Sequence, residues 1–366
     1  MADSISALAV AVTQTTLSSL RSNYMSSQMR FLPVAALGIQ LLLTTASHGA
    51  QFSGLYIFGD SLSDPGNNAL ALGSKVSPPT NVTLQSEITS DGFIPTFPYV
   101  NSLQYSNGDV WAYQFARMLG LPSQVAGPVL GGAGMNYAFG GATTGPLNNS
   151  DGPPSLLTQV SIFTGSIGSG QAPSDALYIV AGGGNDARAA LAAIAGGGDP
   201  NTVIATMAAQ YAANVGSIVD TLQGKGAQNI VVWNVPNIGL APGIAYLGPT
   251  VSYLGTTLAQ SMNDALSLRL SSETGIRTFD AFGLITSIHA NPGAYGLTYA
   301  STAGGSVPGA DLAKYLCWDG IHPTTAGHTI IAQSLYGAVV PEPSNIALLV
   351  AGMVLMSIPM VLRRRS

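Results

Sequence analysis

The sequence predicts a three-layer α/β/α sandwich built around a mainly parallel β-sheet. Two observations support this fold class. Short, continuously apolar runs, typical of strands that are buried on both faces, alternate along the chain with longer segments of helical periodicity. Polar or glycine-rich segments follow several of these runs, at the strand ends where ligands of such sheets commonly bind.

The first half of the chain supplies four of the predicted elements. Residues 55–58 form the first apolar run and predict a strand. Residues 109–121 (DVWAYQFARMLGL) carry apolar side chains at helical spacing and predict an amphipathic helix. Residues 176–181 (ALYIVA) are rich in β-forming side chains and precede a run of glycines, which predicts a second strand. Residues 202–222 predict a long helix.

The second half continues the alternation. Residues 229–235 (NIVVWNV) predict a strand that ends before Pro236, because proline cannot donate to a sheet. Residues 251–272 predict a helix, residues 276–280 a short strand, and residues 324–336 a closing helix. Alternating strands and helices of this kind favour parallel pairing.

Two polar stretches rich in glycine and proline, residues 74–107 and 291–313, interrupt the alternation. We expect both to be long loops on the rim of the sheet at its carboxyl end, where ligand contacts are usually built. Residues 51–340 contain no internal repeat and no linker rich in Pro, Gly or Ser, so we expect them to form one domain.

Composition argues against several classes of partner. Charged residues make up only 8% of the chain, and the formal net charge is −5. Residues 51–340 contain 7 Lys or Arg and 15 Asp or Glu, a net charge of −8, so a nucleic-acid partner is not expected. The single cysteine, Cys317, cannot form an internal disulfide. Metal-ligand spacing, a phosphate-binding loop and a dinucleotide fingerprint are absent from this region, so we expect no metal and no cofactor.

Residues 1–50 are predicted to direct export. Arg30 is a short basic start, residues 31–43 form an apolar run, and small residues follow through Ala50. This is the pattern of a secretory signal peptide that is cleaved near its small residues. Residues 1–28 are polar and without pattern, so they are either an extended start of the signal or the product of an upstream start codon.

Residues 341–366 form most of a three-part tail. The motif VPEPS at residues 340–344 precedes an uncharged apolar run at 346–362 and three arginines at 363–365. The run is about long enough to span a bilayer, and the arginines predict a cytoplasmic end. The tail resembles the PEP-CTERM sorting signal of Gram-negative bacteria. That resemblance implies processing by an exosortase, initial anchoring in the membrane and a mature protein in the cell envelope or outside the cell; the alternative is a permanent membrane anchor.

Three short segments place hydrogen-bonding groups near predicted strand ends. Residues 58–64 (FGDSLSD) put Ser61 directly after the first strand, where its hydroxyl can project into a crevice and its amide can open a helix. Residues 136–142 (NYAFGGA) contain paired glycines whose amides can approach a ligand closely. Residues 182–186 (GGGND) present an asparagine that can donate to an oxyanion or simply form a turn.

A fourth segment, residues 318–323 (WDGIHP), places Asp319 and His322 three positions apart. One turn can then hold the carboxylate beside the imidazole. Such a carboxylate fixes the tautomer of the ring and stabilises the imidazolium that forms when a serine gives up its proton.

Together the four segments, in this order, resemble block for block the SGNH (GDSL) family of serine esterases and lipases. The resemblance covers residues 54–337 and is strongest at FGDSLSDPGN, which starts at Phe58. It implies the SGNH hydrolase fold, an α/β/α sandwich with a mainly parallel, flavodoxin-like sheet.

The resemblance also implies a role for each matching residue. Ser61 would be the nucleophile, His322 the general base and then acid, and Asp319 the residue that orients His322. Gly141 and Asn185 would form the oxyanion hole together with the amide of Ser61. The position of Gly141 is set by counting five residues from the asparagine that opens its segment.

Few other residues compete for these roles in the body of the chain. They are Ser63, Cys317, His289 and His328. Ser63 is expected to point elsewhere from the same turn, and an unpaired cysteine usually behaves as a small apolar side chain. His328 is expected to cap or pack in its helix, and His289 has no carboxylate nearby in sequence. Asp64 and Asp186 are expected to support their turns.

The sequence therefore predicts an exported esterase or lipase that hydrolyses carboxylic esters through an acyl-enzyme on Ser61. Its substrate stays open among short-chain or O-acetyl esters of envelope or exopolysaccharide and lipid esters, and so does transfer of the acyl group to an alcohol instead of water. The alternative from another class is a non-catalytic, surface-displayed glycan-binding or structural protein on the same fold.

Overall fold

The computed structural model describes residues 52–73, 79–122, 134–145 and 152–340. These residues all belong to one compact unit, Ala50–Asn345. The predicted signal peptide and the predicted sorting tail lie outside the described residues, apart from Val340 at the start of the tail motif.

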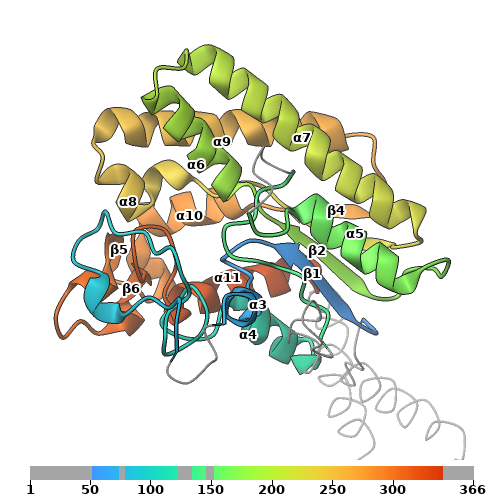
Figure 1. Ribbon diagram of the computed structural model, residues 1–366, viewed down its shortest axis with the longest axis horizontal. Coiled ribbons are helices and arrows are strands. Elements are labelled where there is room, and N and C mark those ends of the chain that lie inside the picture. Colours follow the sequence, from blue (N-terminus) through green and yellow to red (C-terminus); the bar gives the residue numbers. More distant parts are fainter. Residues whose placement is uncertain (1–51, 74–78, 123–133, 146–151, 341–366) are drawn as a thin grey trace, which may run out of the picture. The chain divides into compact units, whose positions relative to one another are not determined.

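A four-stranded parallel sheet forms the centre of the unit (Figure 1). Its strands, in spatial order, are β1 (Leu55–Gly59), β2 (Leu177–Ala181), β3 (Asn229–Trp233) and β4 (Ile276–Phe279). The last residues of neighbouring strands lie side by side, with Gly59 beside Ala181 and Trp233 beside Phe279. The four predicted strands and their parallel arrangement are confirmed, and the segments that follow them emerge along one edge.

Four helices cover one face of the sheet: α5 (Leu156–Ile167), α6 (Gly184–Ala195), α7 (Pro200–Gly224) and α9 (Pro249–Leu270). Alternate residues of the strands face them, because successive side chains of a strand point to opposite sides. Tyr56 packs on Phe163 of α5 with ring centroids 5.0 Å apart, and Tyr178 stacks on Tyr56 at 4.9 Å.

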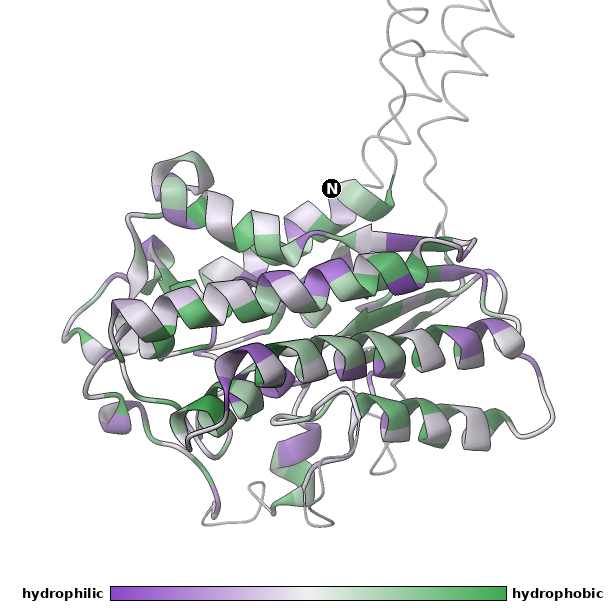
Figure 2. Ribbon diagram, turned by 90° about the horizontal axis from the view of Figure 1, so that it is seen from above, coloured by the Kyte–Doolittle hydropathy of each residue, from purple (hydrophilic) through white to green (hydrophobic). Residues whose placement is uncertain are grey.

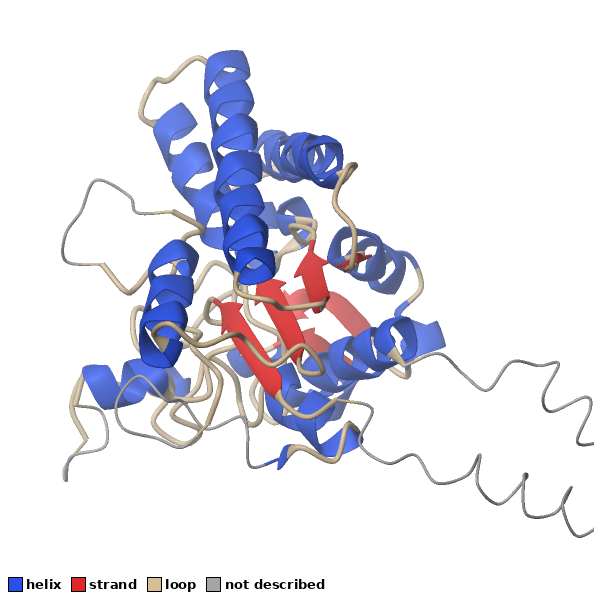
Figure 3. Cartoon of the chain, turned by 90° about the vertical axis from the view of Figure 1, so that its right-hand side faces the viewer, coloured by secondary structure: helices blue, strands red, loops and turns tan. Residues whose placement is uncertain are grey.

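The opposite face is covered by α4 (Trp111–Met118) and α11 (Thr325–Val339). Leu55 and Ile57 of β1 are fully buried in the same cluster as Trp111 and Leu335 from these helices. Figure 3 shows helices on both sides of the sheet, which confirms the predicted three layers.

The helix α7 is the one described helix that is long and apolar enough to cross a membrane by length and composition. Its apolar residues have a different explanation within the fold. Tyr211, Val215 and Ile218 are buried in the core cluster that covers the sheet. Viewed from above, α7 and α9 carry mixed hydrophilic and hydrophobic bands, which fits helices with one buried side (Figure 2).

The ends of the predicted helices differ from the observed ones for local reasons. The helix α7 starts two residues early because Asp199 caps it, accepting from Thr202 N at 2.9 Å, and Pro200 suits its first turn. The helix α4 is shorter than predicted, since Gly120 behind it adopts φ = +74°.

Several elements were not predicted by the sequence patterns. These are the helices α5 and α6, the helices α3 (Asn67–Ala71), α8 (Pro242–Ala245) and α10 (Ala281–Ala290), and the strands β5 (Tyr299–Ala303) and β6 (Tyr315–Cys317). Short 3₁₀ turns add η1 (Gln85–Glu87), η3 (Ile238–Leu240), η4 (Pro292–Tyr295), η5 (Gly304–Ser306) and η6 (Leu312–Lys314).

The expectation that residues 291–313 form a loop was wrong in part. They contain β5, which pairs in parallel with β6 in a second, two-stranded sheet. The ring of Tyr299 stacks on that of Tyr315 with centroids 4.4 Å apart, an interaction between segments that periodicity along one segment does not reveal. Residues 79–107, the described end of the other stretch, form loops that contain only η1.

Candidate active site

Ser61 lies in a tight turn at the carboxyl end of β1. Ser63 N donates to the carbonyl of Asp60 at 3.0 Å, and Leu62 N donates to the side chain of Asp60 at 3.0 Å. A Cβ atom at Gly59 would lie 2.8 Å from the carbonyl oxygen of Ala181, so only glycine fits where the strand enters this turn. The expectation that the Ser61 amide opens a helix was wrong, because the next helix, α3, begins only at Asn67.

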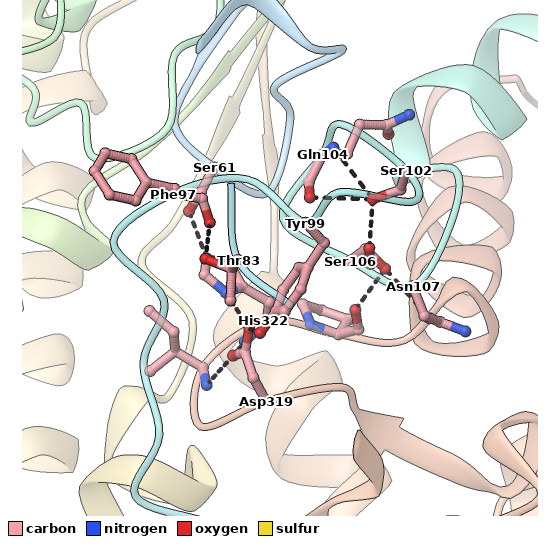
Figure 4. A network of polar contacts seen from close by, with 12 residues as sticks. Ser61, Thr83, Phe97, Tyr99, Ser102, Gln104, Ser106, Asn107, Asp319 and His322 are labelled. Atoms are coloured by element: carbon pink, nitrogen blue, oxygen red, sulfur yellow. Dashed lines mark hydrogen bonds and ion pairs between the residues drawn. The ribbon is translucent and has the colours of Figure 1, made fainter. Parts of the chain in front are cut away.

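Two hydrogen bonds connect Ser61 to the loop behind β6. Ser61 Oγ lies 2.9 Å from His322 Nε2, and His322 Nδ1 lies 2.8 Å from Asp319 Oδ2 (Figure 4). His322 is 2% exposed and Asp319 is completely buried. Because a carboxylate only accepts, we assign the proton to Nδ1, which leaves Nε2 free to accept from the serine hydroxyl.

The other hydrogen bonds of Asp319 fix its orientation. Its Oδ1 atom accepts from the backbone amides of Ile321 and His322, each at 2.8 Å. Its Oδ2 atom, which faces the imidazole, also accepts from the hydroxyl of Tyr99 at 2.7 Å. Tyr99 was not among the residues that the sequence singled out.

Gly141 and Asn185 line the same cavity as Ser61 and His322. Gly141 has φ = +80°, a conformation that favours glycine, and no hydrogen bond to another described residue occupies its amide. The neighbouring amide of Gly140 donates to Asp64 at 2.9 Å, so of the paired glycines Gly141 is the one whose amide stays available. Asn185 Nδ2 donates to the carbonyl of Ala142 at 2.9 Å, which ties this side chain to the glycine segment.

Asp64 does more than support its own turn. It accepts from the amides of Gly66 at 2.8 Å and Asn67 at 2.6 Å, and it also holds Gly140 from the distant glycine segment. Burial raises the pKa of Asp64 to about 6, although its backbone donors act in the opposite direction. Asp64 therefore links the serine turn to the segment that contains Gly141.

Asp186 makes a similar link from the start of α6. Its carboxylate accepts from the amide of Thr144 at 3.0 Å and from the hydroxyl of Thr144 at 2.6 Å. Burial raises the pKa of Asp186. The two carboxylates thus hold the chain at Gly140 and at Thr144, on either side of Gly141; Asp64 follows β1 and Asp186 follows β2.

A comparison with known families matches residues 55–335 to the GDSL-like lipase/acylhydrolase family. The chain belongs to this family. Membership makes it a carboxylic ester hydrolase.

Relatives of this GDSL-like hydrolase include plant and bacterial enzymes. A GDSL esterase/lipase of Arabidopsis thaliana is 27% identical over 260 residues, which cover 65% of this chain and 68% of the relative. Esterase EstA of Pseudomonas aeruginosa is 29% identical over 350 residues, which cover 84% of this chain and 50% of EstA, so the chain spans about half the length of that relative. The solved structure of phospholipase A1 from Streptomyces albidoflavus NA297 is a distant match, with 18% identity and a TM-score of 0.39 over 78% of this chain and 99% of that one.

The alternative nucleophiles and bases of the GDSL-like hydrolase are engaged elsewhere. Ser63 Oγ accepts from the indole of Trp111 at 3.1 Å. Cys317 is buried, and burial raises the pKa of its thiol, so a reactive thiolate is disfavoured. His328 is fully buried, its ring makes no hydrogen bond with the described residues, and burial lowers its pKa to about 3. It packs in α11.

His289 sits in a different setting. Its Nδ1 atom is 3.4 Å from the hydroxyl of Ser301, and no carboxylate contacts it among the described residues. Groups of three or more side chains suited to metal binding are not found in the part of the chain that the structure describes.

Two cavities of the hydrolase meet at Ser61 and His322. The first has a volume of about 110 Å³ and is lined mainly by apolar side chains of η3, α8 and α10, including Ile238, Ile244 and Ile285. The second is a wider cleft of about 450 Å³, with backbone of the glycine segment on one side. Residues 95–97 and 105 also line this cleft, so the predicted contribution of the stretch 74–107 to the rim is confirmed. Residues 291–313 line neither cavity.

Proposed function

We propose that the protein is an exported serine esterase that hydrolyses carboxylic esters through an acyl-enzyme on Ser61. The pair of hydrogen bonds from Ser61 through His322 to Asp319 carries the proposal. It supplies a nucleophile, a base and an orienting carboxylate in one buried line, and a purely glycan-binding or structural protein needs no such line.

In the first half of the reaction, Ser61 Oγ forms a bond to the ester carbonyl carbon while its proton passes to His322 Nε2. The electron pair of the carbonyl moves to its oxygen, which accepts from the amides of Ser61 and Gly141 and from Asn185 Nδ2. When the tetrahedral intermediate collapses, the bond to the alkoxide breaks. The alkoxide takes the proton from His322 and leaves as the alcohol, so the acyl group stays on Ser61.

In the second half, water replaces the alcohol. His322 Nε2 takes a proton from the water, and the oxygen attacks the acyl carbon. Collapse of the second intermediate breaks the bond to Ser61 Oγ, which recovers the proton from His322 as the free acid leaves. The carboxylate of Asp319 stabilises the imidazolium in both halves. An alcohol bound in the wide cleft in place of water would give acyl transfer by the same steps.

The test removes each reacting group in turn. We expect Ser61→Ala and His322→Ala to lose turnover of p-nitrophenyl esters by a factor of roughly 10³ or more. Ser261→Ala is a matched control, because its hydroxyl donates to the Thr257 carbonyl within α9. A fluorophosphonate should add to the parent and to the control but not to Ser61→Ala, as seen by intact mass. Turnover by Ser61→Ala within severalfold of the parent would refute the assignment.

We further propose that the acyl chain binds in the apolar cavity and the alcohol part in the wide cleft. The apolar cavity has room for roughly seven to eleven water-sized groups, at 10–15 Å³ each within its volume of about 110 Å³. Burying methylenes there is favourable by roughly 0.8 kcal/mol each. These features favour acyl chains of medium length over an acetyl group.

A chain-length series of p-nitrophenyl esters, from acetate to laurate, tests this assignment beside an acetylated polysaccharide. Ile285→Trp should narrow the apolar cavity and lower kcat/KM for the longer esters while acetate is spared. Ile162→Trp on α5 is the control, since Ile162 lines neither cavity. The assignment fails if the parent prefers acetyl esters, or if Ile285→Trp affects all chain lengths equally.

We also propose that the protein is exported and that its tail is processed by an exosortase at the Pro-Glu-Pro motif. Support comes from the signal-peptide pattern of residues 29–50 and from the apolar run and arginines of residues 346–365. Cell fractionation of the full chain should place it in the envelope or medium. Replacing Pro341, Glu342 and Pro343 by alanine should leave an uncleaved, membrane-bound form; a tail of unchanged mass in the parent would favour a permanent anchor instead.

A further inference from the structure

The side chain of Tyr99 contacts the carboxylate of Asp319, although Tyr99 lies outside all four sequence motifs. Its side chain is buried, with 3% of the residue exposed. Its hydroxyl donates at 2.7 Å to Asp319 Oδ2, the same oxygen that accepts from His322 Nδ1 at 2.8 Å. Figure 4 shows the phenol pointing at Asp319 beside His322.

The backbone around Tyr99 is fixed by its own segment. Tyr99 N donates to the carbonyl of Gln104 at 2.9 Å, and Val100 N donates to the carbonyl of Thr83 at 3.1 Å. The ring meets Trp318 edge to face with centroids 5.5 Å apart. The phenol is therefore held before any substrate binds.

The same segment is tied to the chain just after the catalytic histidine. Ser106 Oγ donates to the carbonyl of Pro323 at 2.9 Å, and Thr325 N donates to Asn107 Oδ1 at 2.8 Å. These contacts join the Tyr99 segment to the chain that directly follows His322. A shift of one would displace the other.

The phenol is the donor in this contact. Burial, followed by the charge of Asp319, raises the pKa of Tyr99 far above the range in which the protein would work, so the hydroxyl keeps its proton. A hydrogen bond from a neutral donor to a carboxylate stabilises the charged form of that carboxylate. It also reduces the negative charge that the second partner of the same oxygen experiences.

We propose that Tyr99 is a positioning residue of the active site, which acts through Asp319 to set the pH below which His322 stops accepting the serine proton. The inference rests on the proposed function of Ser61, His322 and Asp319. With the Tyr99 hydroxyl in place, Oδ2 divides its charge between two donors. Without it, the whole charge of Oδ2 faces the imidazole and favours protonation of His322 at higher pH.

Tyr99→Phe tests this directly, because the ring that contacts Trp318 is kept. The two backbone donors to Oδ1 remain, so Asp319 keeps its orientation. We expect the acid limb of kcat/KM against pH to move upward by roughly 0.5–1 unit, since a hydrogen bond to a charged group is worth about one to two such units and its loss is partly compensated.

Tyr178→Phe is the matched control. Tyr178 is also completely buried, and its hydroxyl donates to the carbonyl of Pro173 at 2.8 Å, away from the site. This variant should lose stability without moving the acid limb. The profile is measured from about pH 4.5 to pH 8.5 with a p-nitrophenyl ester. Where turnover is too slow to measure, the rate of fluorophosphonate addition to Ser61 over the same pH range gives the acid limb.

The outcomes separate the two proposals. A parent profile without any acid limb means that the proposed role of His322 is wrong. A parent limb that stays in place or moves downward in Tyr99→Phe overturns only the role of Tyr99, even if the variant is slower or less stable. An upward shift in Tyr99→Phe that is absent from Tyr178→Phe supports it.

Discussion

Replacing Asp64 by asparagine should damage catalysis far more than stability. In the parent, one carboxylate oxygen accepts from Gly66 and Asn67, and the other accepts from Gly140 at 2.9 Å and from Asn68 at 3.3 Å. In Asp64→Asn, the carbonyl oxygen of the new side chain can keep the first pair. Its NH₂ group would then face the amides of the second pair, donor against donor.

The effect on stability is the difference between two opposed contributions. Two amides that lose their acceptor cost roughly 1–3 kcal/mol each. The ionised carboxylate itself costs about 3 kcal/mol near neutral pH, because burial raises the pKa of Asp64 from 3.8 to about 6. Asp64→Asn removes that cost, so the net change in unfolding free energy should lie between a gain of about 1 kcal/mol and a loss of about 3 kcal/mol.

The effect on turnover has no such compensation. Losing one oxyanion-hole donor outright costs about 10²–10³ in kcat, and Asp64→Asn only loosens the segment that positions Gly141, so we expect kcat to fall by roughly 10–100-fold with little change in KM. The assay is steady-state hydrolysis of a p-nitrophenyl ester, with urea unfolding alongside. Asp220→Asn, which alters an exposed ion pair with Arg269, is the control. A kcat within severalfold of the parent in folded Asp64→Asn would contradict the link between Asp64 and the oxyanion hole.

Three further outcomes follow from single residues. Asp60 is buried, and burial raises its pKa from 3.8 to about 6. The native state therefore binds more protons than the unfolded chain between these pH values, and it becomes less stable as pH rises through them. Relative to the parent, Asp60→Asn should gain up to about 3 kcal/mol of unfolding free energy between pH 4 and pH 8 in urea unfolding, and a difference that stays constant with pH would count against this. Gly183 has φ = +114°, and a Cβ atom there would lie 2.7 Å from the Tyr211 ring. Gly183→Ala should therefore destabilise the fold by more than about 1 kcal/mol and lower kcat by displacing Asn185, whereas an unchanged melting temperature would argue against it. Cys317 is buried, and burial raises the pKa of its thiol, so a thiol reagent should label it only after unfolding; rapid labelling of the native protein would show that the cavity opens.

The strands β1, β2 and β3 could be predicted from sequence because each is a short apolar run. Residues such as Ile57 and Val231 lie in runs without polar interruption, which is the requirement for burial on both faces. Helix α6 escaped prediction because it begins at Gly184, inside a glycine run followed by Asn-Asp that is typical of a turn. Strand β5 escaped because the sequence YASTA acquires its pairing from a distant partner, Tyr315.

The residues of the candidate site were predictable to the extent that they stand in short motifs. Asp319 and His322 sit three residues apart, so their contact depends on one turn. The contact of His322 with Ser61 spans 261 positions and depends on the whole sheet. Gln159, which brackets Gly59 with hydrogen bonds at 2.8 Å to both its amide and its carbonyl, had no motif to reveal it. The one available signal for Tyr99 was its place in a long polar stretch expected at the rim.

The negative charge near Ser61 bears on the proposed oxyanion hole, whose donors would be neutral amides positioned by buried carboxylates. Asp60 and Asp186 interact unfavourably with each other, and Asp60 interacts favourably with His322. Arg188, which lines both cavities, interacts favourably with Asp60 and Asp319. The field of these carboxylates favours the imidazolium that forms as the serine is deprotonated, but it opposes negative charge on the substrate oxygen. Donors that are held in place before the reaction can offset this repulsion without reorganising. Asp64 and Asp186 would serve this purpose by fixing the chain on either side of Gly141.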